Sequence, residues 1–189
     1  WESVAAFEAE ENVFAEGPYK IAVEHGDPET EGPDKPYFSG STDIDVAARH
    51  VNTAQVTAHV AKSQTFVRIT EAFAKFYHDA EFTVTTGSGN EFTFRPDGTG
   101  DPERIWVKTG TTLTVSGTAR SQSQDGEKEG PLYTFPAETL DATVAATCHI
   151  FTFDASNAGS ASLNIVLGEG EGETRVIPVE LNEEAIPSK

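Results

Sequence analysis

The residues with the clearest spacing for chemistry are Asp43 and Asp45. On a β-strand, side chains two residues apart point to the same face, so the two carboxylates could act as an acid–base pair or hold a cation. No neighbouring residue in the sequence supplies a partner group for either role. We therefore favour a solvated strand face, expect no catalytic residues, and keep a carbohydrate-active hydrolase only as an alternative.

Two acidic loops carry oxygen ligands of the kind that Ca²⁺ prefers. One contains Asp97 and Asp101 within a glycine-rich turn, and the other covers residues 27–31. Neither matches the EF-hand loop, because each is too short and lacks a distal glutamate at the required spacing. Exposed acidic turns are the favoured interpretation, with Ca²⁺ at either loop as the alternative and Asp97 and Asp101 as the candidate ligands. We expect no other cofactor.

The histidines and the single cysteine form no recognisable site. The five histidines show neither an HxH nor an HExxH pattern. Cys148 and His149 are adjacent in an expected strand, so their side chains should point to opposite faces, which disfavours a nucleophile and base pair. A buried structural thiol is the better interpretation. The glycines of residues 168–172 alternate with carboxylates, which repel phosphate, so this segment is interpreted as a turn.

Four aromatic residues could form a platform for sugar rings. Aromatic faces combine apolar area with polar edges, which suits carbohydrate. The candidates are Tyr37, Phe38, Trp106 and Tyr133. Trp106 alternates with Ile105 and Val107 in an expected strand, one face of which must pack into a core. Packing is therefore the favoured role of each aromatic residue, and ligand binding is the alternative.

Composition excludes several classes of partner. The chain has 189 residues, with 31 acidic side chains against 13 Lys and Arg, and a formal net charge of −18. Such a charge disfavours nucleic acid and anionic lipid surfaces. No apolar run approaches the roughly 20 residues that a membrane-spanning helix needs. The chain begins at Trp1 and contains no methionine, so we expect a mature fragment from which an export signal has been removed.

Apolar and polar residues alternate in many short runs, which is typical of half-buried strands. The strands expected on this basis cover residues 19–25, 42–47, 54–62, 65–70, 81–86, 91–95, 104–108, 111–118, 132–135, 146–153, 161–167 and 174–181. We expect the first of them to be an interior strand. About a dozen strands predict an all-β antiparallel sandwich of the transthyretin-like or immunoglobulin-like kind.

One segment has helical rather than strand spacing. Phe73, Phe76 and Tyr77 recur at the i, i+3, i+4 positions of a single apolar stripe, and Thr70 is a suitable N-cap. The pattern predicts one short helix near residues 71–78.

Two turns predict the pairing of neighbouring strands. The turn at residues 87–90 predicts a hairpin in which Phe82 and Val84 lie opposite Phe92 and Phe94. The turn at Thr109-Gly110 predicts a second pair, between residues 104–108 and 111–118.

Several motifs occur in an order that resembles a known family. They are Gly17-Pro18-Tyr19, the strand end His25-Gly26, the corner Lys35-Pro36-Tyr37-Phe38-Ser39-Gly40, and residues 73–84 and 106–115. Together they resemble an uncharacterised family of secreted lipoproteins from Bacteroides-type gut bacteria, catalogued as a domain of unknown function and loosely similar to fimbrillin-like surface proteins. The resemblance spans roughly residues 17–153. No catalytic residues are assigned in that family.

The resemblance implies two β units, export and a lipid anchor. The first unit, residues 1–62, would be transthyretin-like or Cna-B-like, and the second, residues 63–189, a further sandwich. Lipid attachment to a cysteine upstream of Trp1 would place the protein at the cell surface or outer membrane. Members of the family would carry one or two strands before Trp1, so the first sheet is expected to be incomplete.

These observations favour a non-catalytic, exported surface protein with an adhesion, scaffold or glycan-contact role, whose partner is a glycan or another surface protein. The alternative is a fimbrial-type subunit that polymerises by strand donation, with residues 174–179 as the donor.

Overall fold

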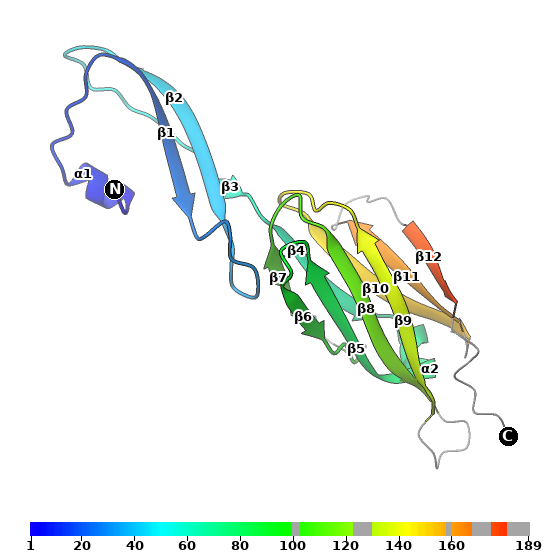
Figure 1. Ribbon diagram of the computed structural model, residues 1–189. Helices are drawn as coiled ribbons and strands as arrows, with labels where there is room; N and C mark the ends of the chain where they lie inside the picture. The colour runs from blue at the N-terminus through cyan, green and yellow to red at the C-terminus, as the bar shows by residue number, and fades with distance from the viewer. Residues whose placement is uncertain (100–102, 123–129, 158–159, 168–174, 181–189) are drawn as a thin grey trace. The chain divides into compact units, whose positions relative to one another are not determined.

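The computed structural model describes residues 1–99, 103–122, 130–157, 160–167 and 175–180 (Figure 1). Contacts divide the chain into two units. Residues 1–25 and 38–59 form the hairpin unit, and residues 26–37 and 60–189 form the sandwich unit. The expected division after residue 62 stays a prediction, but in the structure the 26–37 loop groups with the sandwich unit.

The hairpin unit is built around one three-stranded sheet in the order β1-β2-β3. Its elements are α1 (Val4–Glu8), β1 (Gly17–His25), β2 (Phe38–Val46) and β3 (His59–Val60). The Ser3 hydroxyl accepts a hydrogen bond from the Ala6 amide and so caps α1. This helix is additional to the single one predicted from the sequence.

Strand β1 lies at the edge of its sheet and not in the interior, so the prediction of an interior strand was wrong. It pairs with β2, Gly17 lying opposite Val46 and His25 opposite Phe38. Residues 19, 21 and 23 are half-buried, while residues 18, 20, 22 and 24 are exposed. The alternation of polar and apolar residues along β1 therefore indicates one half-buried face. Edge strands and interior strands both have such a face, so the pattern does not show whether a strand is paired on both sides.

The predicted strand over residues 54–62 was wrong in extent, because only His59 and Val60 form β3. The segment before β3 runs close to β2 instead. A Cβ atom at Gly40 would lie 2.2 Å from the carbonyl oxygen of Thr57. A glycine in β2 thus admits a close backbone approach that a side chain would block.

The sandwich unit packs a five-stranded sheet, in the order β12-β11-β10-β4-β7, on a four-stranded sheet, in the order β6-β5-β8-β9, among the described residues (Figure 1). Its elements are β4 (Ser63–Ile69), α2 (Glu71–Phe76), β5 (Tyr77–Thr86), β6 (Glu91–Phe94), β7 (Ile105–Val107), β8 (Leu113–Ser121), β9 (Leu132–Leu140), β10 (Cys148–Asn157), β11 (Ser160–Leu167) and β12 (Arg175–Glu180). The predicted all-β sandwich is confirmed. It is mainly antiparallel, with β4 and β10 forming a parallel pair.

The first hairpin is confirmed, and the predicted helix is confirmed over Glu71–Phe76, whereas Tyr77 and His78 belong to β5. Thr70 caps α2 by accepting a hydrogen bond from the Phe73 amide. Phe82 lies opposite Phe94, and Val84 opposite Phe92. Both features arise from short stretches of sequence, in which turn and capping residues determine the local geometry.

The predicted pairing around Thr109-Gly110 was wrong. Strand β7 pairs with β4 of the five-stranded sheet, whereas β8 pairs with β5 and β9 of the other sheet. The turn therefore carries the chain from one layer of the sandwich to the other. Sequence neighbours in a sandwich often belong to different sheets. The turn expected at residues 168–172 lies outside the described residues.

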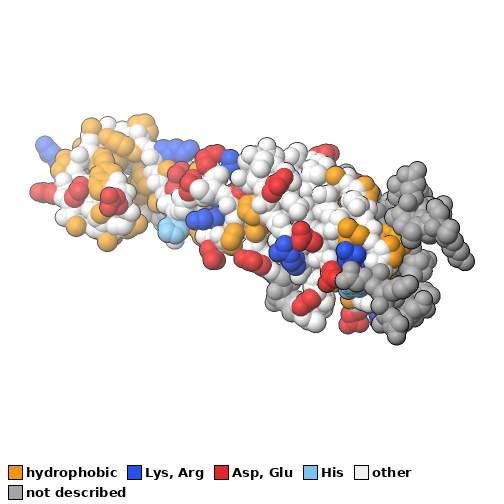
Figure 2. All heavy atoms as spheres, turned by 60° about the horizontal axis from the view of Figure 1, so that its bottom comes forward, with side chains coloured by type: hydrophobic (Ala, Val, Ile, Leu, Met, Phe, Trp, Pro, Cys, Tyr) orange, Lys and Arg blue, Asp and Glu red, His pale blue; other side chains and the backbone are white. Residues whose placement is uncertain are grey.

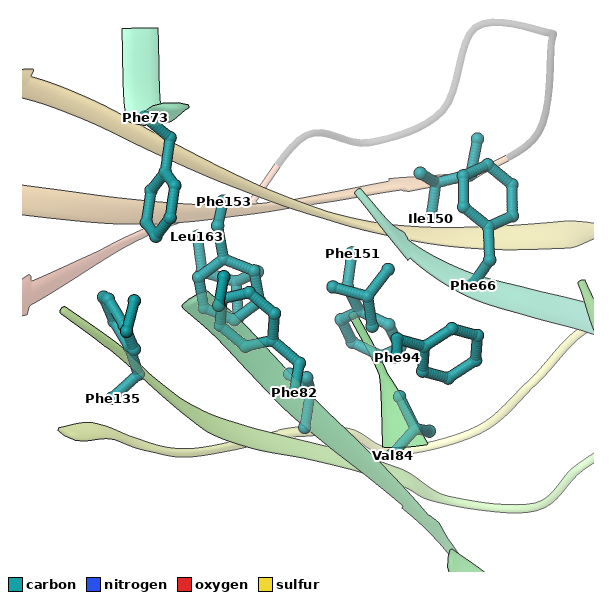
Figure 3. Close-up of a cluster of buried hydrophobic side chains, with 14 of the residues drawn as sticks. Phe66, Phe73, Phe82, Val84, Phe94, Phe135, Ile150, Phe151, Phe153 and Leu163 are labelled. Carbon is teal, nitrogen blue, oxygen red and sulfur yellow. The ribbon is translucent and has the colours of Figure 1, made fainter. Parts of the chain in front are cut away.

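The core of the sandwich is dominated by phenylalanine (Figure 3). Phe82 of β5 stacks on Phe153 of β10 with ring centroids 3.8 Å apart and an interplanar angle of 20°. These rings come from opposite sheets, so their contact holds the two layers together. Phe135 of β9 and Phe73 of α2 pack around them. The described residues contain no helix long and apolar enough to cross a membrane.

Truncation of this stack should be costly. We expect Phe82→Ala to lower the free energy of unfolding by about 3–5 kcal/mol, because the side chain is fully buried and its removal leaves a cavity between the sheets. Urea denaturation followed by circular dichroism measures the change. Leu132→Ala is the control, since Leu132 is 48% exposed, and should change stability by less than about 1 kcal/mol. Equal losses of stability in the two variants would contradict the central role of the Phe82 stack.

Candidate functional site

The carboxylates Asp43 and Asp45 lie on the exposed face of β2. Asp43 is directly across from Lys20 of β1 in the register of the pair. With Pro18, Tyr19 and Ile44 these residues line a hollow of about 330 Å³. Lys20 offsets the charge of Asp43, whereas Asp45 lies opposite Pro18, so this face stays net acidic. The role of the two carboxylates stays a prediction.

The four predicted aromatic residues lie on separate elements. Tyr37 is in the 26–37 loop and Phe38 begins β2. Trp106 lies in β7, whereas Tyr133 lies in β9 of the other sheet and packs edge-to-face on Tyr77. All four side chains are half-buried. Their role as a ligand platform stays a prediction, and the two in strands of the sandwich belong to different sheets.

Asp97 is exposed and makes contacts within its own turn. Its Oδ1 accepts hydrogen bonds from the Thr99 amide at 2.8 Å and the Thr99 hydroxyl at 2.9 Å. These bonds lower the pKa of Asp97, the backbone bond contributing most. The other predicted Ca²⁺ ligand, Asp101, lies outside the described residues. Within the described ranges, no three His, Cys, Asp or Glu side chains are grouped closely enough to hold a metal ion.

His149 is fully buried, and its neighbour Cys148 is half-buried. The Nε2 atom of His149 accepts a hydrogen bond from the Val144 amide at 3.0 Å. Burial lowers the pKa of this histidine, and a ring that accepts a hydrogen bond at Nε2 is in its neutral form. The neutral ring thus fastens the segment before β10 and has a structural role.

The most elaborate polar arrangement among the described residues fastens the 26–37 loop to the sandwich. At its centre is Lys62, which is only 2% exposed. Its ammonium group donates to the carbonyl oxygens of Asp27 at 2.6 Å and Lys35 at 3.1 Å, and also to that of Thr30. A buried ammonium is stable only when its three donors find acceptors. The loop supplies all three acceptors. The buried charge of Lys62 therefore depends on the loop, and the position of the loop depends on Lys62.

Glu31 makes the second attachment of this loop. Its Oε2 accepts hydrogen bonds from the Thr86 hydroxyl and the Asn90 amide group, each at 2.7 Å, and its Oε1 accepts one from the Lys108 backbone amide at 3.0 Å. Burial by itself would raise the pKa of Glu31, but these hydrogen bonds and the charge of Lys108 together hold that pKa below its usual value. The carboxylate form is the one that the site stabilises.

Backbone and surface contacts complete the attachment. Gly32 and Trp106 exchange two backbone hydrogen bonds, each 2.9 Å long. Glu29 forms an ion pair with Lys108 at 2.7 Å. Gly26 begins the loop with a φ of +91°, and a Cβ there would lie 2.2 Å from the Pro36 carbonyl oxygen, so only glycine fits. The acidic turn expected at residues 27–31 thus belongs to a loop that is fixed to the rest of the sandwich unit.

The hairpin unit presents a different kind of surface. None of residues 1–25 and 38–59 is buried. Trp1 is 67% exposed, Val13 85% and Val51 97%. Trp1 also contacts Phe7 and Phe14, and Phe14 contacts Tyr19, so that four aromatic rings form a cluster at the surface. Figure 2 shows orange apolar side chains gathered over this unit, at the left of the view. The unit therefore has exposed apolar area, and the outer edge of β1 is unpaired among the described residues.

We expect Lys62→Met to loosen the 26–37 loop. The substitution retains the aliphatic stem but leaves three loop carbonyl groups without their donor, which should lower the free energy of unfolding by about 1–3 kcal/mol. Hydrogen exchange should quicken at the Gly32 and Trp106 amides. Lys75→Met, at an exposed position of α2, is the matched control. Unchanged exchange at Gly32 would show that Lys62 does not hold the loop.

The stabilising effect of Glu31 should depend on pH. Because its folded-state pKa is lowered, its contribution is present above the unfolded-state pKa, which is about 4.3 for glutamate, and is lost as the pH falls through the folded-state value. Glu31→Gln should therefore be less stable than the natural chain at pH 7, and the difference should shrink below about pH 4.3. Urea unfolding at several pH values measures this. Glu91→Gln, at an exposed site, should track the natural chain throughout; a gap that does not vary with pH would contradict the assignment.

Comparisons with known proteins give a family but no activity. A search of curated proteins finds no match, and neither does a search of solved structures. The model of one family, described as "Domain of unknown function (DUF4493)", matches residues 2–183. That match covers nearly the whole chain, including the hairpin, the 26–37 loop and the sandwich. The chain therefore belongs to the DUF4493 family of domains of unknown function.

Proposed function

We propose that this chain is a non-catalytic module of an exported surface protein, which acts in adhesion or as a scaffold by binding other proteins through its hairpin unit. The observation that carries the proposal is the surface of that unit. None of its residues is buried, and Trp1, Val13 and Val51 are largely exposed. The outer edge of β1 is unpaired among the described residues. Exposed apolar area of this kind is typical of binding surfaces.

The charge and the resemblance support an extracellular setting. A net charge of −18 keeps the chain away from polyanions and anionic lipid surfaces. The motifs that resemble secreted lipoproteins of Bacteroides-type bacteria include the β1 strand and the 35–40 corner. We therefore place the protein at the cell surface or outer membrane, attached to the membrane only through lipid on a cysteine upstream of Trp1.

Strand addition is the second candidate, and the free edge of β1 favours it. A sheet edge with unpaired backbone groups can accept a strand from another chain. The segment first considered as the donor, residues 174–179, overlaps β12, which pairs with β11 in its own sheet. Under this alternative β1 is therefore the better candidate for the intermolecular contact. Glycan binding by the four aromatic residues has less support, because they lie on separate elements.

Surface exposure can be tested on intact cells. Antibodies raised against residues 1–189 should label cells that express the full-length protein without permeabilisation, and external protease should remove the signal. A cytoplasmic protein, labelled only after permeabilisation, is the control. Labelling of the protein only in permeabilised cells would overturn the proposed location and with it the adhesion or scaffold role.

A further inference from the structure

We propose that the partner of β1 is a second copy of this chain, and that two β1 strands pair antiparallel about a two-fold axis at Ala22. The pairing would join two three-stranded sheets into one six-stranded sheet. The inference rests on the proposed function, since it names the protein that the hairpin unit binds. Lys20 of one copy then lies opposite Glu24 of the other, twice in each dimer.

The edge of β1 is suitable for this pairing. Strand β1 is nine residues long and pairs only with β2 among the described residues. No backbone hydrogen bond joins its outer edge to another described segment. Figure 1 shows β1 beside β2 in this sheet. Small sheets are marginally stable alone and gain hydrogen bonds when an edge accepts a strand.

The faces of the two sheets match in this arrangement. A two-fold axis perpendicular to the sheet keeps each face on its own side, so residues that pair must share a face. With the axis at Ala22, Ile21 lies opposite Val23 of the second copy, and Tyr19 lies opposite His25. These residues lie on the face where residues 19, 21 and 23 are half-buried. The half-buried faces of the two copies thus become continuous.

Charge selects the position of the axis. Lys20 and Glu24 are the two charged residues within residues 18–24, both on the exposed face of β1. An axis at Lys20 or at Glu24 would place like charges opposite each other, which is destabilising in a cross-strand pair. An axis at Ala22 pairs the two opposite charges. Lys20 then lies between Asp43 of its own β2 and Glu24 of the second copy.

Proline sets the length of the pairing. Pro18 has no N–H group to donate, and in this register it lies opposite Gly26 of the second copy, one residue beyond the end of β1. Residues 19–25 of each copy therefore pair. The sequence of β1 is self-complementary over that length in charge, apolar character and hydrogen-bonding groups.

Charge exchange tests the register. Sedimentation of the natural chain should show a reversible dimer. Lys20→Glu and Glu24→Lys should each weaken it by roughly tenfold, because each replaces two attractive pairs with two repulsive ones. An equimolar mixture of the two variants should recover the affinity, since both cross-strand pairs are then opposite in charge. Lys75→Glu and Glu71→Lys, at exposed positions of α2, make the same changes in net charge and should leave the dimer unchanged.

Two outcomes would overturn the inference. One is a natural chain that sediments as a monomer up to about 0.5 mM, a concentration at which a specific dimer should be populated. The other is a mixture of Lys20→Glu and Glu24→Lys that associates no better than either variant alone. Circular dichroism of each variant confirms that a lost dimer does not reflect a lost fold.

Cross-linking tests the axis independently. In a Cys148→Ser background, Ala22→Cys places two cysteines directly opposite each other at the axis, and mild oxidation should give a disulfide-linked dimer. Ser41→Cys, which neighbours Ala22 in the β1–β2 register but lies one strand inward, is the matched control and should stay monomeric. Equal cross-linking of both variants, or of neither, would contradict pairing at Ala22.

The results separate this inference from the proposed function. A protein that is labelled on intact cells but is monomeric in solution would contradict the β1 pairing and leave the surface role standing. A dimer that is found only inside cells would contradict the surface role and leave the β1 pairing standing.

Discussion

The stack of Phe82 on Phe153 is the contact on which the sandwich depends. The two rings come from different sheets and lie 3.8 Å apart, closer than any other ring pair described in the core. Sheets that pack face to face are held by side chains of their inner faces, and large aromatic rings supply most buried area per residue. Phe73 brings α2 into the same cluster, and Phe135 brings in β9. The interior of the sandwich is filled by these rings, so contacts with other molecules must use its outer surface or the hairpin unit.

A second constraint is the attachment of the 26–37 loop, which depends on charged groups and hydrogen bonds and not on apolar packing. Lys62 is buried at the start of the sandwich unit, and an isolated ammonium group in that position would be strongly destabilising. Three carbonyl groups of the 26–37 loop offset this, and Glu31 reaches across to the turn after β5 and to Lys108. An acidic segment that would otherwise be a solvated connector is thereby ordered. The same segment continues into β2 of the hairpin unit.

The hairpin unit lacks both kinds of constraint. It has no buried residue, its aromatic cluster lies at the surface, and β1 has an unpaired edge among the described residues. A sheet of this size contributes little stability by itself. Under the proposed function this surface contacts another molecule, and under the proposed pairing that molecule is a second copy of the chain. The chain therefore combines a sandwich unit that has a buried aromatic core with a hairpin unit that has no buried residue.

The sequence by itself determined the all-β class, the capped helix after Thr70 and the hairpin that pairs Phe82 with Phe94, because these depend on alternation, capping and turn residues within a few positions. It also showed Asp43 and Asp45 on one strand face. Only the tertiary structure decided that β7 pairs with β4, that β4 and β10 run parallel, and that β1 is an edge strand. The cage around Lys62 was equally hidden, since its acceptors are backbone carbonyls, which every residue carries and no sequence pattern marks. Contacts between distant segments depend on how the layers close, and local patterns do not encode that closure.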